Sequence, residues 1–139
     1  MRCALRVPRG WTACVTRGRK PPRSWKGSAA EQAIDLDNIT EATVIFEGTA
    51  TESSLRYPKN ANVTAAVALS GIGFNDTHVQ LIADPAVDKN IHEIHAKGSF
   101  GEMFVRLSNN SLPDNPKTSW LAALSIEEAI LKQIETFIF

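Results

Sequence analysis

Two of the three histidines in the chain lie three positions apart within NIHEIHAKGSFG, at residues 90–101. An imidazole titrates near neutral pH, so it can bind a metal ion or exchange a proton with a substrate. The pattern of this segment indicates a β-strand followed by a tight turn, and residues three apart on a strand point to opposite faces of a sheet. His92 and His95 therefore diverge. Because a stable metal site needs about three or four converging ligands, we predict no metal here.

A single histidine could still act as a general acid or base. On the expected strand His92 shares its face with Ile94, whereas His95 shares its face with the charged Glu93. His92 is therefore the first candidate for proton transfer, and His78, in a turn-like stretch, is another. The alternative for each histidine is a hydrogen-bonded surface residue, and the spacing leaves both interpretations open.

Two expected helix starts carry polar side chains that could contact a ligand. Residues 60–73 are small and apolar and follow Lys59, with Asn60 or Asn62 available as the N-cap. An asparagine at a helix start either caps the helix or presents a donor and an acceptor to a bound group. Lys117, at the next expected helix start, forms a similar polar corner. Capping and ligand binding remain open at both places.

The elements that must position these side chains alternate between strands and helices. Sequence patterns predict strands at residues 42–47, 79–83, 91–97 and 102–108. The last two form a hairpin through a glycine-rich turn. Helix starts are predicted near residue 29, at a capping box of Thr49 and Glu52, near residue 60, and at Asn115 with Pro116. We therefore expect an α/β (α+β) fold in which helices flank a mixed β-sheet.

The two ends of the chain differ from its middle. Arginines and lysines crowd residues 1–26, which contain no acid, so all 15 acidic residues lie in the remainder. Trp11 and Trp25 stand alone among these cations, so we predict no nucleic-acid binding. We expect residues 1–27 to form a basic connector and the remnant of a preceding region, and residues 28–139 to form one domain. The apolar residues of the last helix spread around its axis, which predicts burial on more than one side.

The composition, with 43% hydrophobic and 22% charged residues, is typical of a globular domain. No apolar run approaches the roughly 18 to 20 residues of a membrane span, so we predict no membrane association. Both cysteines, Cys3 and Cys14, lie near the N-terminus, which excludes a disulfide or zinc framework for the rest and favours a cytoplasmic location. Gly71-Ile72-Gly73 closes a helix and lacks the third glycine of a dinucleotide-binding loop.

Three blocks in the same order resemble one family. They are YPKNANVTAAVALSGIGF at residues 57–74, LIADPAVDKNIHEIHAKGSFGEM at residues 81–103 and LPDNPKTS at residues 112–119. Together they are similar to the C-terminal, substrate-side domain of the NAD(P)-dependent L-aspartate dehydrogenases, and the similarity runs from about Arg19 to Ser125. In that family an N-terminal Rossmann domain precedes this one, so the resemblance implies a truncated form that is inactive alone. Dihydrodipicolinate reductase, which has a related architecture, is disfavoured because HEIH does not match its paired histidines.

The resemblance also implies a reaction and its residues. The enzyme takes a hydride from L-aspartate with NAD or NADP as cofactor, yields iminoaspartate and then oxaloacetate, and feeds NAD biosynthesis. The family's catalytic histidine lies in an Asn-x-His-x-Ile block, which places this role on His92. Its cofactor-contacting asparagine lies in an Asn-x-Asn-Val block, which corresponds to Asn62. Lys59 and Lys117 are candidates for binding the substrate carboxylates, with solvated surface lysines as the alternative.

The resemblance further implies a homo-oligomer. A different class of function remains open, because the same domain could serve as a non-catalytic oligomerisation or interaction module. Binding of NAD or aspartate separates the two hypotheses, since a module used only for assembly would oligomerise without binding either ligand.

Overall fold

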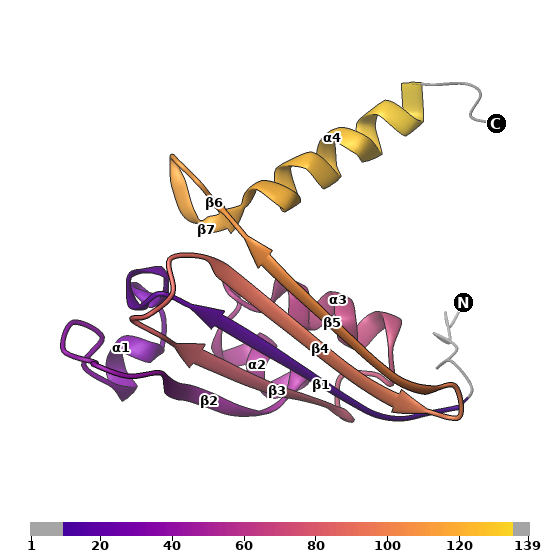
Figure 1. Cartoon of the computed structure of the whole chain (residues 1–139), viewed down its shortest axis with the longest axis horizontal. Helices are drawn as coiled ribbons and strands as arrows, with labels where there is room; N and C mark the ends of the chain where they lie inside the picture. The colour runs from indigo at the N-terminus through magenta and orange to yellow at the C-terminus, as the bar shows by residue number, and fades with distance from the viewer. Residues whose placement is uncertain (1–9, 135–139) are drawn as a thin grey trace.

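A five-stranded mixed sheet forms the centre of the structure, a computed structural model that describes residues 10–134 apart from the side chains at 115–118 and 133–134. Its strands lie in the order β2-β3-β1-β4-β5 (Figure 1). β1 runs parallel to β3, and the other neighbouring pairs are antiparallel. The strands are β1 Trp11–Lys20, β2 Thr43–Thr49, β3 Thr77–Ala83, β4 Asn90–Gly98 and β5 Gly101–Asn109.

Short helices cover one face of this sheet. They are the 3-10 helix η1 Pro22–Trp25 and the α-helices α1 Ala30–Ala33, α2 Ala50–Arg56 and α3 Asn62–Ser70. α2 packs on β2 and β3, and α3 contacts β3, so both helices lie behind the strands in Figure 1. Side chains alternate between the faces of a strand, and every second residue of β1 from Cys14 to Lys20 is buried. The helices and the inward side chains of the sheet thus enclose the core.

The core is built around three aromatic rings. Trp25 is fully buried, and its indole N–H donates to the Ile82 carbonyl over 3.2 Å. The Tyr57 ring stands edge-on to Trp25 and Phe46, with ring centroids 6.3 Å and 5.6 Å apart. The Tyr57 hydroxyl donates to the Ile45 carbonyl over 3.3 Å. Both polar ring ends are therefore satisfied inside the core, as buried tryptophan and tyrosine require.

The strand and hairpin predictions are confirmed, since β3, β4 and β5 cover the predicted ranges and β2 begins one residue later than predicted, at Thr43. The capping box also forms, with the Glu52 N–H donating to the Thr49 hydroxyl over 3.2 Å and the Thr49 N–H donating to the Glu52 carboxylate over 2.8 Å. Helix α3 forms as predicted, but Ala61 is its N-cap, so neither Asn60 nor Asn62 caps it. A mixed sheet flanked by helices confirms the predicted fold class.

Residues 10–27, which we expected to form a connector, belong to the folded domain, and Trp11–Lys20 is a strand of its sheet. β1 lies in the middle of the sheet, between β3 and β4, and the PPRSW segment after it brings Trp25 into the core. The period-two pattern of this strand is hard to recognise because its inward residues are small or polar, namely Cys14, Thr16, Gly18 and Lys20.

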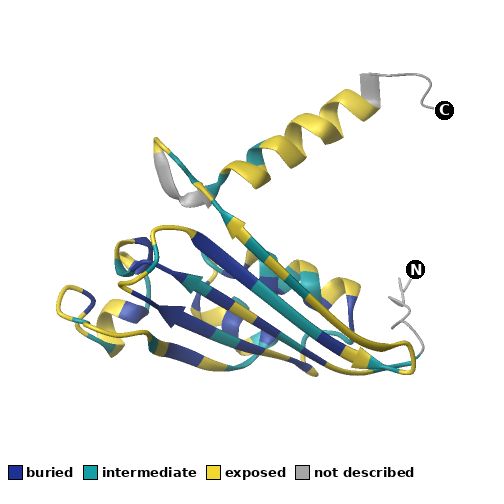
Figure 2. Cartoon of the chain, viewed as in Figure 1, coloured by how far each residue is buried: buried dark blue, intermediate teal, exposed yellow. Residues whose placement is uncertain are grey.

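The C-terminal part differs from the prediction at its helix start. β6 Ser111–Leu112 and β7 Asn115–Ser119 pair as a small hairpin where we expected a helix from Asn115 and Pro116. α4 instead spans Trp120–Ile134. This helix points away from the sheet (Figure 1), and its large apolar side chains are exposed (Figure 2), so the predicted burial is wrong here. None of the described helices combines the length and the apolarity needed to cross a membrane.

Candidate active site

A cavity of about 460 Å³ lies where the end of β1 and the start of β4 approach the first turns of α3 and α4. It is lined by Lys20, Pro58, Lys59, Asn60, Asn62, Val63, Asn90, His92, Ser119 and Ala122. Three residues singled out in the sequence, His92, Asn62 and Lys59, therefore lie around one space. The fold brings them together from separate elements, because β4 and α3 are not neighbours along the chain.

His92 reaches this cavity from the inner part of the sheet. It pairs with Gly18 on β1, and it is 9% exposed. A Cβ at Gly18 would lie 3.9 Å from His92 Nδ1, so the imidazole lies against the backbone of β1. His95 lies on the opposite face, where it contacts Glu102. The prediction that the two histidines diverge is confirmed, and His92 is the one that lines the cavity.

The surroundings of His92 keep its ring neutral at physiological pH. Burial, and next the positive charge of Lys20, lower the pKa of His92 from 6.5 to about 4. A neutral imidazole has one unprotonated nitrogen, which can accept a proton from a substrate or from water. The arrangement therefore suits a general base.

Lys20 also lines the cavity, although it is not among the site residues predicted from the sequence. Lys20 is 5% exposed, its ammonium nitrogen lies 5.6 Å from the centre of the Trp25 ring, and burial lowers its pKa. The preceding residue, Arg19, binds the Asp84 carboxylate over 2.7 Å. The sequence does contain a pattern that could identify Lys20 as a buried residue. Side chains alternate between the two faces of β1, so every second residue from Cys14 points inward, and the last of them is Lys20.

The other predicted residues lie in different places. Asn62, the first residue of α3, and Lys59 both line the cavity, and both are exposed. Their cofactor and substrate roles stay predictions. Lys117 belongs to β7, and its side chain lies outside the described part of the structure. His78 lies on β3, with its Nε2 atom 3.1 Å from Glu47. Among the described residues no three His, Cys, Asp or Glu side chains cluster closely enough to hold a metal ion.

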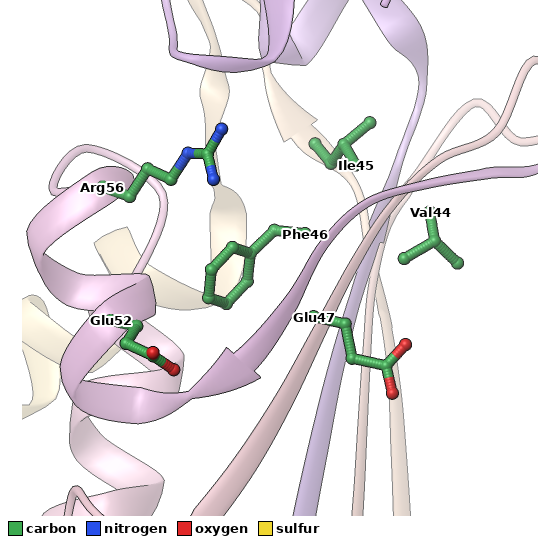
Figure 3. A pocket seen from close by; sticks show the side chains of 6 residues that line it. All are labelled: Val44, Ile45, Phe46, Glu47, Glu52 and Arg56. Carbon is green, nitrogen blue, oxygen red and sulfur yellow. The ribbon is translucent and has the colours of Figure 1, made fainter. Parts of the chain in front are cut away.

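A second hollow, of about 600 Å³, lies between β2 and α2. It is lined by Val44, Ile45, Phe46, Glu47, Glu52 and Arg56 (Figure 3). The Phe46 ring lies on the side of β2 that faces α2, and the Glu52 carboxylate closes the capping box. The Glu47 carboxylate lies on the other side of β2, beside His78. Both acids thus have structural partners, so we place the candidate active site at the cavity around His92.

The neutral buried histidine should make the stability of the fold depend on pH. The unfolded chain takes up a proton on His92 near pH 6.5, whereas the folded chain does so only near pH 4. Protons therefore favour the unfolded state between pH 6.5 and pH 4. The stability that is present above pH 6.5 is lost progressively as the pH falls to about 4. We expect His92 alone to remove about 3 kcal/mol of unfolding free energy across this pH range.

Urea denaturation at a series of pH values measures this effect, with His92→Gln as the comparison because glutamine does not titrate. The difference in unfolding free energy between the wild type and His92→Gln should change between pH 6.5 and pH 4. Parallel pH profiles would contradict the assignment of a neutral buried imidazole at position 92.

Comparison with known proteins points to one family. The family model described as aspartate dehydrogenase, C-terminal, matches residues 8–133. The L-aspartate dehydrogenase of Acinetobacter baumannii is 51% identical over 119 residues, covering 86% of this chain and 45% of that protein. The L-aspartate dehydrogenase of Ralstonia nicotianae is 50% identical over 121 residues, covering 87% of this chain and 45% of that protein.

A solved structure agrees with the sequence comparisons. The crystal structure of aspartate dehydrogenase from Thermotoga maritima matches with a TM-score of 0.68 at 26% identity, covering 97% of this chain and 49% of that one. The chain spans about half the length of the relatives it matches. Since the family model covers nearly all of the chain and the fold agrees, the chain belongs to the aspartate dehydrogenase C-terminal domain family.

Proposed function

We propose that this chain forms the substrate-side half of an NAD(P)-dependent L-aspartate dehydrogenase. This oxidoreductase would convert L-aspartate to iminoaspartate and, after hydrolysis, to oxaloacetate and ammonia. The observation that carries the proposal is a neutral His92 in the same cavity as Asn62 and Lys20, in a chain of this family. We take L-aspartate as the substrate because the relatives are named L-aspartate dehydrogenases. We propose the activity for the chain when it is combined with a nucleotide-binding half.

His92 is the proton acceptor in this mechanism. The aspartate nitrogen is an ammonium group at neutral pH, and it must lose a proton before its lone pair can form the C=N bond while the Cα–H bond breaks. Neutral His92 can take that proton. The chemistry that a bound nicotinamide supplies is acceptance of the hydride from Cα.

The same histidine can serve the hydrolytic step. His92 takes a proton from a water molecule, whose oxygen adds to the imine carbon while the C=N π electrons move to the nitrogen. Protonated His92 then returns the proton to that nitrogen, and ammonia leaves as the new hydroxyl group loses its proton and forms the C=O bond of oxaloacetate. The two carboxylates of the substrate bring negative charge into the cavity, which raises the pKa of His92 and strengthens it as a base. A lowered pKa in the free chain is therefore compatible with proton transfer near neutral pH.

Asn62 supports the cofactor part of this proposal. This side chain lines the cavity at the first turn of α3, and because Ala61 holds the N-cap position, the amide of Asn62 is not used for capping. A primary amide offers donors and an acceptor that complement the carboxamide of nicotinamide. We infer that Asn62 holds the carboxamide of NAD or NADP and so helps to fix which face of the ring meets the substrate.

We also propose that the protein works as a homo-oligomer in the cytoplasm, and that its imine product feeds NAD biosynthesis. Exposed apolar side chains on β5 and α4, among them Phe104 and Leu124, support an assembly because exposed apolar surface often marks an interface. The buried free thiol of Cys14 is compatible with a reducing compartment.

Fusion with the nucleotide-binding half of the Acinetobacter baumannii relative tests the proposed activity. The fused protein should reduce NAD or NADP when L-aspartate is added, measured by the absorbance of the reduced nicotinamide. A folded fusion that oligomerises but neither binds aspartate nor reduces either cofactor would contradict the proposal and support the non-catalytic module instead.

A further inference from the structure

Lys20 is the most deeply buried cation among the described residues, and it has no carboxylate partner, whereas several more exposed cations do. Five cations lie within 3.3 Å of a carboxylate, namely Arg19, Lys26, Lys97, Arg106 and Lys132. Lys20 is only 5% exposed, yet no carboxylate of the described residues forms an ion pair with it. Its ammonium group instead lies over the ring of Trp25, 5.6 Å from the centroid.

An ammonium group without a counter-charge is costly to bury, because it loses its hydration. The ring of Trp25 offsets part of this cost through a cation–π interaction. Core packing does not require the charge, since an apolar side chain of similar length would fill the same volume without desolvating a cation. A buried charge at the wall of a cavity therefore indicates an anionic group that enters the cavity from outside.

The position of Lys20 identifies the source of that anionic group. Gly18 pairs with His92, and Lys20 lies two residues further along β1 on the same face of the sheet. The two side chains line one cavity, and the charge of Lys20 acts on the imidazole of His92. The nicotinamide ring and its carboxamide carry no negative charge. An anionic group beside the proton-accepting histidine therefore belongs to the substrate.

We propose that Lys20 binds a carboxylate of the dicarboxylic amino-acid substrate. The identity of that substrate rests on the proposed function, whereas the binding role of Lys20 goes beyond the roles given there to His92 and Asn62. The ammonium group of Lys20, held between β1 and Trp25, is a fixed donor for a carboxylate oxygen.

Carboxylate binding and proton transfer are coupled through this residue. In the free chain the charge of Lys20 opposes protonation of His92. A carboxylate bound to Lys20 offsets that charge and makes His92 a stronger base. A ligand without this carboxylate binds less tightly and also leaves His92 a weaker base. Lys20 therefore contributes to substrate specificity in two ways, through binding affinity and through proton transfer.

Binding of malonate, a small dicarboxylate without an amino group to oxidise, tests this role on the 139-residue chain. We expect Lys20→Met to raise the Kd for malonate about 10- to 100-fold in isothermal titration calorimetry, because a charge-assisted hydrogen bond contributes on that scale. Methionine is similar in length to the lysine stem, and circular dichroism checks that the variant folds. Lys97→Met is the matched control. It removes the same charge from an exposed lysine paired with Glu102, outside the cavity, and should leave Kd unchanged.

Titration of His92 by NMR supplies a second readout that a merely structural lysine would not affect. Malonate should raise the pKa of His92 in the wild type, and Lys20→Met should raise it without malonate. Equal affinity of the wild type and Lys20→Met for malonate, or no binding by the wild type, would overturn the role of Lys20. The activity of the fused protein tests the proposed function separately, so failure of one proposal is distinguishable from failure of the other.

Discussion

Replacing His92 with glutamine in the fusion with a nucleotide-binding half is expected to lower kcat for aspartate oxidation about 100- to 10,000-fold. Glutamine is polar and close in size to the imidazole, so the buried cavity wall is largely preserved, but it cannot accept a proton at neutral pH. The loss should fall on kcat, because Lys20 and the other cavity residues that we propose to contact the substrate are unchanged. Steady-state reduction of NAD at varied aspartate concentration measures both kcat and KM.

His95→Gln is the matched control for this experiment. It makes the same chemical change three residues along β4, on the opposite face of the sheet, where His95 contacts Glu102. We expect kcat to stay near the wild-type value. An active His92→Gln enzyme, or an equal loss in His95→Gln, would show that His92 is not the base.

The second large effect is expected from Trp25→Ala, which should lower the free energy of unfolding by about 3–5 kcal/mol. Trp25 is fully buried, packs edge-on against Tyr57 and donates a hydrogen bond to the Ile82 carbonyl. Alanine leaves a large cavity and removes the hydrogen bond to the Ile82 carbonyl on β3. It also removes the ring over which the ammonium group of Lys20 lies, so the cavity wall should weaken along with the core.

Trp120→Ala is the control for this substitution, since Trp120 is 49% exposed at the start of α4. We expect it to change the free energy of unfolding by no more than about 0.5 kcal/mol. Urea denaturation of both variants at neutral pH provides the comparison. If Trp25→Ala costs no more than Trp120→Ala, the segment after β1 contributes little to the fold and acts as the connector that the sequence indicated.

Local features were predictable from the sequence because short-range geometry decides them. The capping box of Thr49 and Glu52 depends on residues three positions apart, and it forms as expected. The β4–β5 hairpin follows from two strand patterns and a glycine-rich turn. The opposite orientation of His92 and His95 follows from the period of a strand alone.

The central strand could not be predicted in this way, because its partners lie far away along the chain. Cys14 pairs with Thr77 on β3, and Gly18 pairs with His92 on β4. These pairings bury β1 although its inward residues are not large apolar ones. A pattern of hydrophobicity contains no information about such long-range pairing, so it predicts a connector here and not a strand with an inward-facing Lys20.

The last helix shows a related limit. Its apolar residues are typical of a helix that packs against another surface, but a sequence pattern does not identify that surface. In this chain α4 points away from the sheet, and residues such as Leu124 and Ile130 are exposed. The predicted start of α4 is also wrong, because pairing of β7 with β6 overrides the capping pattern at Asn115 and Pro116.

The candidate site combines both kinds of information. Strand periodicity predicts that the side chains of His92 and His95 point to opposite faces of the sheet, and the family blocks single out His92 and Asn62. The shared cavity of His92, Asn62 and the buried Lys20, and the low pKa of His92 in it, are visible only in the folded chain. Local periodicity orients a side chain within its own element, whereas its neighbours, its burial and its charge environment depend on contacts between β1, β4 and α3.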